Sequence, residues 1–300
     1  MKCLMYFIPL FLLLPEGQLL AQAPGYGVAL IPAKLKRHAN AVIRDEQLKI
    51  DIAKPGEVWI TEQKVITVLN PNGKQDGAIR IYYNKSRPVQ SVSGALYDGD
   101  GNLLRKFRKS DFQDVSMIGD FSLFDDDRMK RLLPAAPGYP YTVRYRYRQK
   151  YKFTLYLPKW LPVNTENVSV AHASFQLSSP TSIPVRYHGW NLGEPVIDSS
   201  GEKTVICTWK LQDLGALTDE PYSPPFFRAG VPVLIVAPER FAYYGMKGQF
   251  DDWKQYGKWV YGHLLKGRDV LPQETVSLVR QMTAGDSSAV EKAKRLYNYA

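Results

Sequence analysis

Very few side chains in this sequence could serve as a nucleophile. Its cysteines are Cys3 and Cys207, and Cys207 alternates with apolar residues that include Trp209. A reactive thiol needs a neighbouring base or cation that favours the thiolate, and an apolar strand supplies neither. We therefore expect Cys207 to be buried and inert. The sequence also lacks the G-x-S-x-G, phosphate-loop and dinucleotide-binding motifs.

The histidines are too scattered to indicate a metal site. They are His38, His172, His188 and His263. None of them forms an i, i+4 pair or an H-x-E motif, the spacings that place two ligands on one helix face. We predict no catalytic residue, no cofactor-binding residue and no metal ligand in this chain. A zinc site assembled from distant ligands is the alternative.

An acidic triplet, Asp125, Asp126 and Asp127, is the densest group of carboxylates. Calcium requires several more oxygen ligands at defined spacing, and neither an EF-hand glycine nor a distal glutamate follows. We interpret the triplet as an acidic turn. We expect it to lie near a basic strand that follows it, because a row of like charges on one strand face requires counter-charge or water.

That strand is residues 141–152, which read YTVRYRYRQKYK. A period of two places tyrosines and valine on one face and cations on the other. The two faces are Tyr141, Val143, Tyr145 and Tyr147, against Thr142, Arg144, Arg146 and Arg148. The pattern predicts an antiparallel sheet with one side on a core and one side in water. The basic face of Arg144, Arg146 and Arg148 is either an ordinary solvated surface or a binding surface for an anionic polymer.

Composition places the chain among folded globular proteins. It has 300 residues, 45% of them hydrophobic and 23% charged, with a net charge of +10. This length is enough for a substantial core in one large or two ordinary domains. The positive charge favours contact with anionic surfaces or polymers.

The N-terminus is typical of a secretory signal peptide. Lys2 precedes an apolar run from Cys3 to Pro15, and small residues follow at Ala21 and Ala23. The run is shorter than the roughly 20 residues that a membrane-spanning helix needs. We predict a signal peptide of residues 1–21, with the cleavage site between Ala21 and Ala23. The protein is then exported to the periplasm or cell surface, without a transmembrane segment after cleavage.

The next part of the chain indicates a β-sandwich domain of residues 22–240. Short alternating apolar segments run from residue 46 to residue 211. Turn sequences such as Asn70–Gly73 and Asp98–Gly101 separate them. About ten short strands of this kind favour an antiparallel sandwich over a barrel. The fold class is therefore mainly β, followed by a helical segment.

Helical periodicity begins after Phe250 and defines a segment of residues 241–300. Asp251 and Asp252 are candidate N-caps. Pro272 fits the first position of a second helix, and Ser288 with Glu291 fits a capping box for a third. The stripe expected on the first helix comprises Trp253, Tyr256, Val260, His263 and Leu264. The buried stripe expected on the third comprises Val290, Ala293, Tyr297 and Ala300. No stop signal follows, so we expect a truncated chain.

These features together resemble one group of exported bacterial proteins. The motifs that carry the resemblance are a β-rich region with Phe124–Arg128 and Tyr139–Tyr145, and helices at Trp253 and Ser287–Tyr299. In that group a β-domain of unknown function, here residues 40–240, precedes a transglutaminase-like core of papain-related fold. Residues 289–299 look like the helix that opens this core.

The resemblance implies a Cys-His-Asp thiol site in the full gene product. None of that triad can be placed on a residue here, because Cys207 lies in a strand upstream of the opening helix. We expect the non-catalytic N-terminal portion of an exported thiol enzyme, whose β-domain positions a substrate or partner. The alternative is a complete non-catalytic binding module for glycan or peptide. Expected partners are a protein, a peptide or a cell-envelope polymer, and not nucleic acid.

Overall fold

The computed structural model describes residues 25–117, 126–163, 165–218, 222, 231–268 and 270–299. The predicted signal peptide and its cleavage site between Ala21 and Ala23 lie outside these residues. Asp125 and Ala300 also lie outside them.

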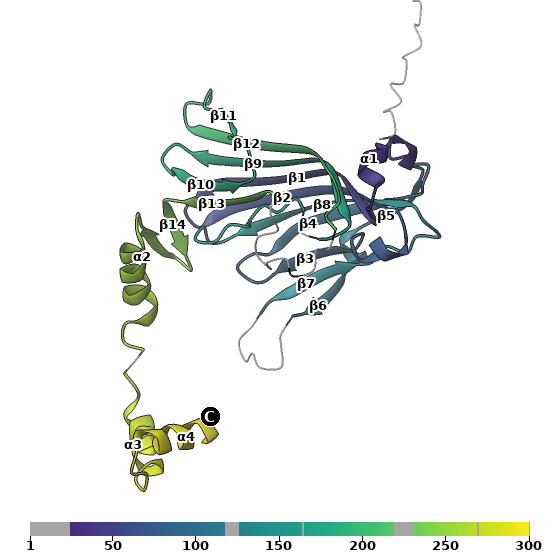
Figure 1. The fold of residues 1–300 in the computed structure, drawn as a ribbon. Helices are drawn as coiled ribbons and strands as arrows, with labels where there is room; N and C mark the ends of the chain where they lie inside the picture. Colours follow the sequence, from purple (N-terminus) through teal and green to yellow (C-terminus); the bar gives the residue numbers. More distant parts are fainter. Residues whose placement is uncertain are drawn as a thin grey trace, which may run out of the picture.

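An eight-stranded sheet is the largest element of the fold (Figure 1). Its strand order is β11-β12-β9-β1-β2-β8-β4-β5. The strands are β1 (Ala41–Lys54), β2 (Glu57–Val68), β4 (Val89–Tyr97), β5 (Leu103–Phe107), β8 (Tyr141–Tyr151), β9 (Val168–Pro180), β11 (Val196–Asp198) and β12 (Thr204–Leu214).

The sheet is antiparallel at every neighbouring pair except β1 and β9, which run parallel. The chain reaches β9 from β8, which is separated from it in the sheet by β1 and β2, through a crossover connection that contains Trp160. Trp160 in this crossover is buried and bridges to Leu234. The predicted mainly β fold class is confirmed, and the parallel pair is a departure from a purely antiparallel sheet.

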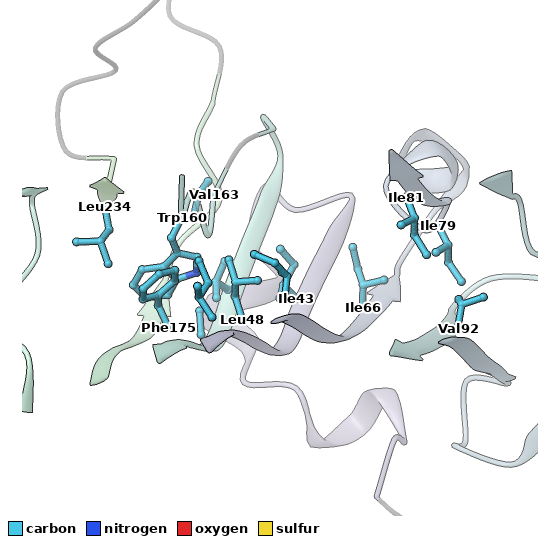
Figure 2. Close-up of a cluster of buried hydrophobic side chains, with 14 of the residues drawn as sticks. Ile43, Leu48, Ile66, Ile79, Ile81, Val92, Trp160, Val163, Phe175 and Leu234 are labelled. Atoms are coloured by element: carbon cyan, nitrogen blue, oxygen red, sulfur yellow. The ribbon is translucent and has the colours of Figure 1, made fainter. Parts of the chain in front are cut away.

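Smaller sheets form a second layer over one face of the large sheet. One has the order β3-β7-β6, and another pairs β10 with β13. Their strands are β3 (Ile79–Tyr83), β6 (Gln113–Ser116), β7 (Arg128–Leu132), β10 (Val185–Trp190) and β13 (Val233–Pro238). Figure 2 shows Ile79 and Ile81 facing Val92, and Trp160 lying close to Phe175. One contiguous apolar core between two layers of sheet defines a sandwich.

Strand β8 has the two faces that its sequence predicts. Tyr141 and Val143 are buried in the core, whereas Arg146 is exposed on the outer side. Thr142 is an exception, because it is on the outer side and yet fully buried. Its hydroxyl hydrogen bonds that of Thr67 at 2.8 Å.

The N-terminal segment explains this exception. It contains η1 (Val28–Leu30) and α1 (Ala33–Lys36), and it packs Ile31, Leu35 and Ala39 against Val42. Ser169 on β9 donates a hydrogen bond of 2.6 Å to the Leu35 carbonyl. The outer side of the sheet is therefore covered at this end and open at the other. The two remaining short helices are η2 (Pro71–Gln75) and η3 (Lys109–Asp111).

A hairpin joins the sandwich to the first C-terminal helix. The elements are β14 (Arg240–Tyr243), β15 (Met246–Gln249), α2 (Trp253–Val260) and the π-helical turn η4 (Tyr261–Leu265). Asp252 caps α2 as predicted, because its carboxylate accepts from the Gln255 amide at 2.7 Å.

The predicted stripe of this helix is only partly confirmed, because Tyr256, Val260 and Leu264 are half-buried but its first residue is not. Trp253 is 84% exposed, and Trp259 is the residue of α2 that is buried. The Trp259 indole donates to the Lys247 carbonyl at 3.0 Å, and its ring meets Phe241 at 4.9 Å. The hairpin therefore buries Trp259, a residue that the predicted stripe omits.

The last two helices, α3 (Gln273–Met282) and α4 (Ala289–Tyr299), lie apart from the sandwich in Figure 1. The predicted capping box is present, since the Glu291 amide donates to Ser288 Oγ at 3.2 Å and the Ser288 amide donates to Glu291 Oε2 at 3.3 Å. The predicted burial of the α4 stripe is wrong, because Val290 is 63% and Tyr297 is 85% exposed. Burial of a stripe requires a partner surface, and the described residues provide none here. Within the described residues no helix is long and apolar enough to cross a membrane.

Candidate functional site

Cys207 lies in β12, directly opposite Leu177 of β9. It is partly rather than fully buried. Burial raises the pKa of its thiol. Because the thiolate is the nucleophilic form, this environment makes Cys207 less reactive than an ordinary surface cysteine.

The structure leaves the four histidines in different elements. His172 is on β9 and His188 is on β10, where its ring packs against Trp190 at 4.2 Å. His263 stacks on Trp259 at 5.1 Å, and His38 follows α1. Among the residues that the structure describes, no three His, Cys, Asp or Glu side chains are grouped so that they could hold a metal ion.

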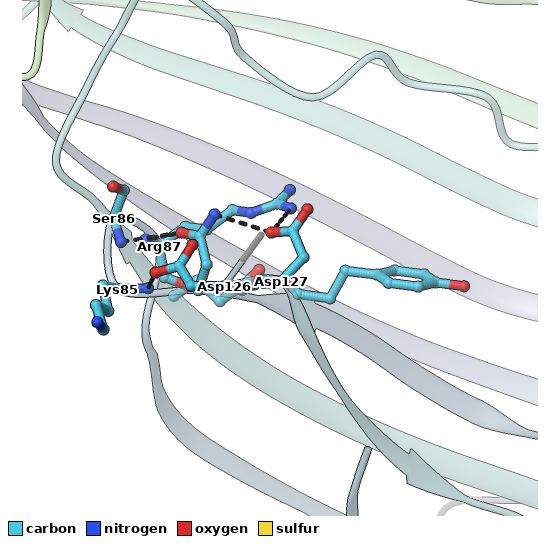
Figure 3. A network of polar contacts seen from close by, with 8 residues as sticks. Lys85, Ser86, Arg87, Asp126 and Asp127 are labelled. Atoms are coloured by element: carbon cyan, nitrogen blue, oxygen red, sulfur yellow. Dashed lines mark hydrogen bonds and ion pairs between the residues drawn. The ribbon is translucent and has the colours of Figure 1, made fainter. Parts of the chain in front are cut away.

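The acidic turn has a different neighbour from the one predicted. Asp127 forms an ion pair of 2.8 Å with Arg87 and accepts from the Asn84 amide at 2.9 Å (Figure 3). Asp126 accepts from the Lys85 backbone amide at 3.3 Å. The hydrogen bond from Arg87 holds the pKa of Asp127 below its usual value.

The expectation that this turn lies near the basic face of β8 is therefore corrected for Asp126 and Asp127. The turn leads into β7, which belongs to the second layer on the core side of the large sheet. Arg144, Arg146 and Arg148 are on the opposite side of that sheet. The two groups of opposite charge are thus separated by the sheet itself.

A buried polar cluster lies on the core side of the large sheet. Glu46 of β1, Lys64 of β2 and Tyr145 of β8 are direct neighbours across three strands. Two residues further along these strands, Glu62 of β2 is opposite Tyr147 of β8. Because strand residues two apart share a face, all five side chains belong to the same side of the sheet.

Each carboxylate oxygen in the cluster has a partner of its own. Lys64 Nζ lies 2.6 Å from Glu46 Oε2, and Trp160 Nε1 donates to Glu46 Oε1 at 3.2 Å. The Tyr145 hydroxyl donates to Glu62 Oε1 at 2.9 Å, and the Tyr147 hydroxyl donates to Glu62 Oε2 at 2.6 Å. The indole of Trp160, in the connection between β8 and β9, is thus part of the hydrogen-bond network of the cluster.

Burial and charge determine the protonation states in this cluster. Desolvation raises the pKa of Glu46, and the attraction of Lys64 opposes that rise. Desolvation works to lower the pKa of Lys64, but Glu46 and Glu62 together raise it. Desolvation and the charge of Glu62 raise the pKa values of Tyr145 and Tyr147 well above the usual value. At neutral pH Lys64 is therefore charged, and both phenols are protonated donors.

The cluster borders a cavity of about 480 Å³, which also has Asp76, Arg80 and Lys159 in its lining. This volume is within the range of small-ligand sites. The carboxylates, however, are already satisfied by protein donors. The arrangement stabilises buried charge, and it presents neither a free nucleophile nor an unpaired base.

The sequence contains a signal that could have predicted this cluster. Leu48, Ile50 and Ile52 set the core-facing positions of β1, and Val58 and Ile60 set those of β2. Glu46, Glu62 and Lys64 continue these two alternations with charged residues. Three charges at core-facing positions of paired strands indicate a buried network, but strand pairing must be known first.

The second candidate is the outer face, which we define as the uncovered end of the large sheet opposite the core. It comprises Gln47, Lys49, Trp59, Thr61, Gln63, Arg146, Arg148, Lys150, Ser174, Gln176 and Lys210. These residues are paired side by side across β1, β2, β8, β9 and β12. The Arg148 guanidinium lies 3.9 Å from the centre of the Trp59 ring, and Lys150 pairs with Glu57 at 3.0 Å.

The fold defines this protein as a mainly β sandwich with appended helices. Residues 54–218, more than half of the chain, match the DUF3857 family, a domain of unknown function with solved structures. The chain therefore belongs to the DUF3857 family. A search of curated proteins found no match.

A solved structure of low sequence identity shares the fold of this chain. A candidate protease from Parabacteroides distasonis is 16% identical with a TM-score of 0.64, over 87% of this chain and 50% of that one. The present chain thus spans about half the length of that protein. Aminopeptidase A from Legionella pneumophila is 13% identical with a TM-score of 0.33, over 71% of this chain and 22% of that one. An M1 zinc metallopeptidase from Deinococcus radiodurans is 12% identical with a TM-score of 0.33, over 81% and 53%. The last two likenesses are too weak to inform function.

Proposed function

We propose that this chain is the non-catalytic N-terminal portion of an exported, transglutaminase-like thiol enzyme. In this proposal the β-sandwich positions a substrate or partner, and α3 and α4 belong to the start of the enzymatic core. The observation that carries the proposal is the exposed apolar side of α4, where Val290 is 63% and Tyr299 is 64% exposed.

Helices of this kind require a packing partner. The helices α3 and α4 have 10 and 11 residues, and isolated helices of this length are marginal in water. An amphipathic helix gains its stability by burying its apolar face. Leu278 of α3 is 40% exposed and Tyr297 of α4 is 85% exposed. A further part of the enzymatic core is the proposed cover for these side chains.

Two other observations support an active centre outside the described residues. The sulfur of Cys207 is in a strand with a raised thiol pKa, which is unsuited to a thiol nucleophile. The candidate protease with a TM-score of 0.64 is about twice as long as the part that this chain covers. Protease activity is a property named for that protein, and it enters here as part of the proposal.

The test compares the 300-residue chain with the full gene product obtained by extending the coding sequence past codon 300. We expect amide hydrogens of α3 and α4 to exchange at least about tenfold more slowly in the longer protein, because docking raises their local unfolding free energy by about 1.4 kcal/mol or more. Amides of β2 and β8 serve as the control and should not change. Equal exchange of α3 and α4 in both proteins would contradict the proposal, as would a stop codon directly after residue 300.

The second candidate function is a complete, non-catalytic binding module. The outer face favours it, because an open surface with an excess of cations suits the binding of an anionic partner and needs no catalytic residue. A longer gene product without cysteine, histidine and aspartate in a thiol site would favour this alternative.

A further inference from the structure

We propose that the outer face of the large sheet binds an anionic polysaccharide. This inference names a partner for the β-domain of the proposed function, and it requires only the sandwich. Its test therefore does not depend on the presence of an enzymatic core.

The cations of β8 are arranged as a regular row. Arg146, Arg148 and Lys150 alternate with core-facing residues along one strand. Residues two apart on a strand are separated by about 6.6 Å, so this row extends over about 13 Å. A regular row of charges on a rigid strand fits a ligand whose own charges repeat along a chain.

The neighbouring strands add hydrogen-bonding groups and further cations. Arg146 is paired with Gln63, which is paired with Gln47 of β1. Ser174 and Lys210 continue this line across β9 and β12.

A second row of paired residues, two positions along each strand from the first, also combines cations with amide and hydroxyl side chains. Arg148 is paired with Thr61, which is paired with Lys49 and then with Gln176. Amide and hydroxyl side chains between cations are suited to sugar hydroxyls that alternate with acidic groups.

The outer face has more positive than negative charge. Arg146 and Lys49 form no ion pair with any residue that the structure describes. Glu57 is already engaged by Lys150 and Lys54. Asp51 is the acidic residue beside Arg148 and Lys49. The excess of cations leaves charge that a polyanion would neutralise.

The chemistry of the face favours a polysaccharide over a lipid membrane. Proteins that lie on a membrane insert aromatic or aliphatic side chains below the headgroups. Trp59 is the large aromatic residue among those that define the outer face, and the Arg148 guanidinium lies over its ring at 3.9 Å. The outer face is polar and spans five neighbouring strands, which fits a polymer that lies along it.

The experiment uses heparin, a sulfated polysaccharide, as the probe and the chain without its signal peptide as the protein. We expect saturable binding that weakens as salt rises. The double variant Arg146→Gln/Arg148→Gln should bind at least about tenfold more weakly, a change of about 1.4 kcal/mol. Lys49→Gln/Lys210→Gln is a second, independent pair on the same face and should weaken binding as well.

The matched control is Lys292→Gln/Lys294→Gln, which removes the same charge from exposed positions of α4. It should retain heparin affinity within about twofold. Equal loss in the control, unchanged affinity in both outer-face pairs, or binding to anionic phospholipid vesicles without binding to heparin would overturn the proposal. Loss of heparin binding with unchanged exchange in α3 and α4 would concern only this inference, so the two proposals can fail separately.

Discussion

Lys64 is the residue on which the buried polar cluster depends. Its ammonium group is 2.6 Å from Glu46 and lies on the same strand as Glu62, two positions away. A buried charge pair is a weak source of net stability, but removal of one partner leaves the other unpaired in an apolar surrounding. The cluster is therefore more sensitive to a single substitution than to replacement of the pair.

We predict that Lys64→Met lowers the free energy of unfolding by about 3–5 kcal/mol at pH 7, because Glu46 is left buried without a cation. Urea unfolding followed by tryptophan fluorescence measures the change. Lys49→Met on the exposed outer face should change stability by no more than about 0.5 kcal/mol. A loss of similar size in both variants would show that the effect is not due to burial.

The Arg87–Asp127 pair predicts an acid-sensitive contribution. Its hydrogen bond holds the pKa of Asp127 below the value of an unfolded chain. The stabilisation is therefore complete above the unfolded pKa, near pH 4, and is lost as pH falls through the lower folded value. The stability difference between the native protein and Asp127→Asn should shrink progressively below about pH 4. A difference that stays constant from pH 7 to pH 2.5 in urea titrations would contradict this assignment.

At the scale of single elements, helix caps follow from the local sequence, whereas the burial of a helix residue depends on the element that packs against it. The caps at Asp252 and Ser288 were predictable, because a capping side chain and its amide are three residues apart in the sequence. The burial of Trp259 in α2, in place of the predicted Trp253, was not predictable in this way. It depends on the β14–β15 hairpin, which receives Trp259 and leaves Trp253 in solvent.

We predict that Trp259→Ala releases α2 from the hairpin. The substitution removes the contact with Phe241 and the hydrogen bond to Lys247, and should lower the local unfolding free energy of α2 by about 3 kcal/mol. Hydrogen exchange of residues 253–260 would accelerate accordingly, with β1 and β2 unchanged. Trp253→Ala is the matched control and should leave this exchange unaffected. Equal acceleration in both variants would contradict the docking described here.

At the scale of the whole molecule, the sandwich divides the two faces of β8 between different roles. The tyrosine side meets Glu62 and the core, and the arginine side forms the outer face. The N-terminal segment covers only one end of that side, which is why Thr142 is buried and Arg146 is exposed. The proposed polysaccharide contact and the proposed enzymatic partner therefore involve separate surfaces, the sheet and the C-terminal helices.

The sequence by itself determined the strand periodicity of residues 141–152, the mainly β class and the helix caps, because each depends on residues close together in the chain. Only the tertiary structure decided that Glu46, Lys64 and Tyr145 are neighbours, since they come from three strands whose pairing involves long-range contacts. The same holds for Asp127, whose partner Arg87 lies 40 residues away in the segment that connects β3 and β4. Short-range patterns determine which elements form, and long-range packing determines which of their faces meet.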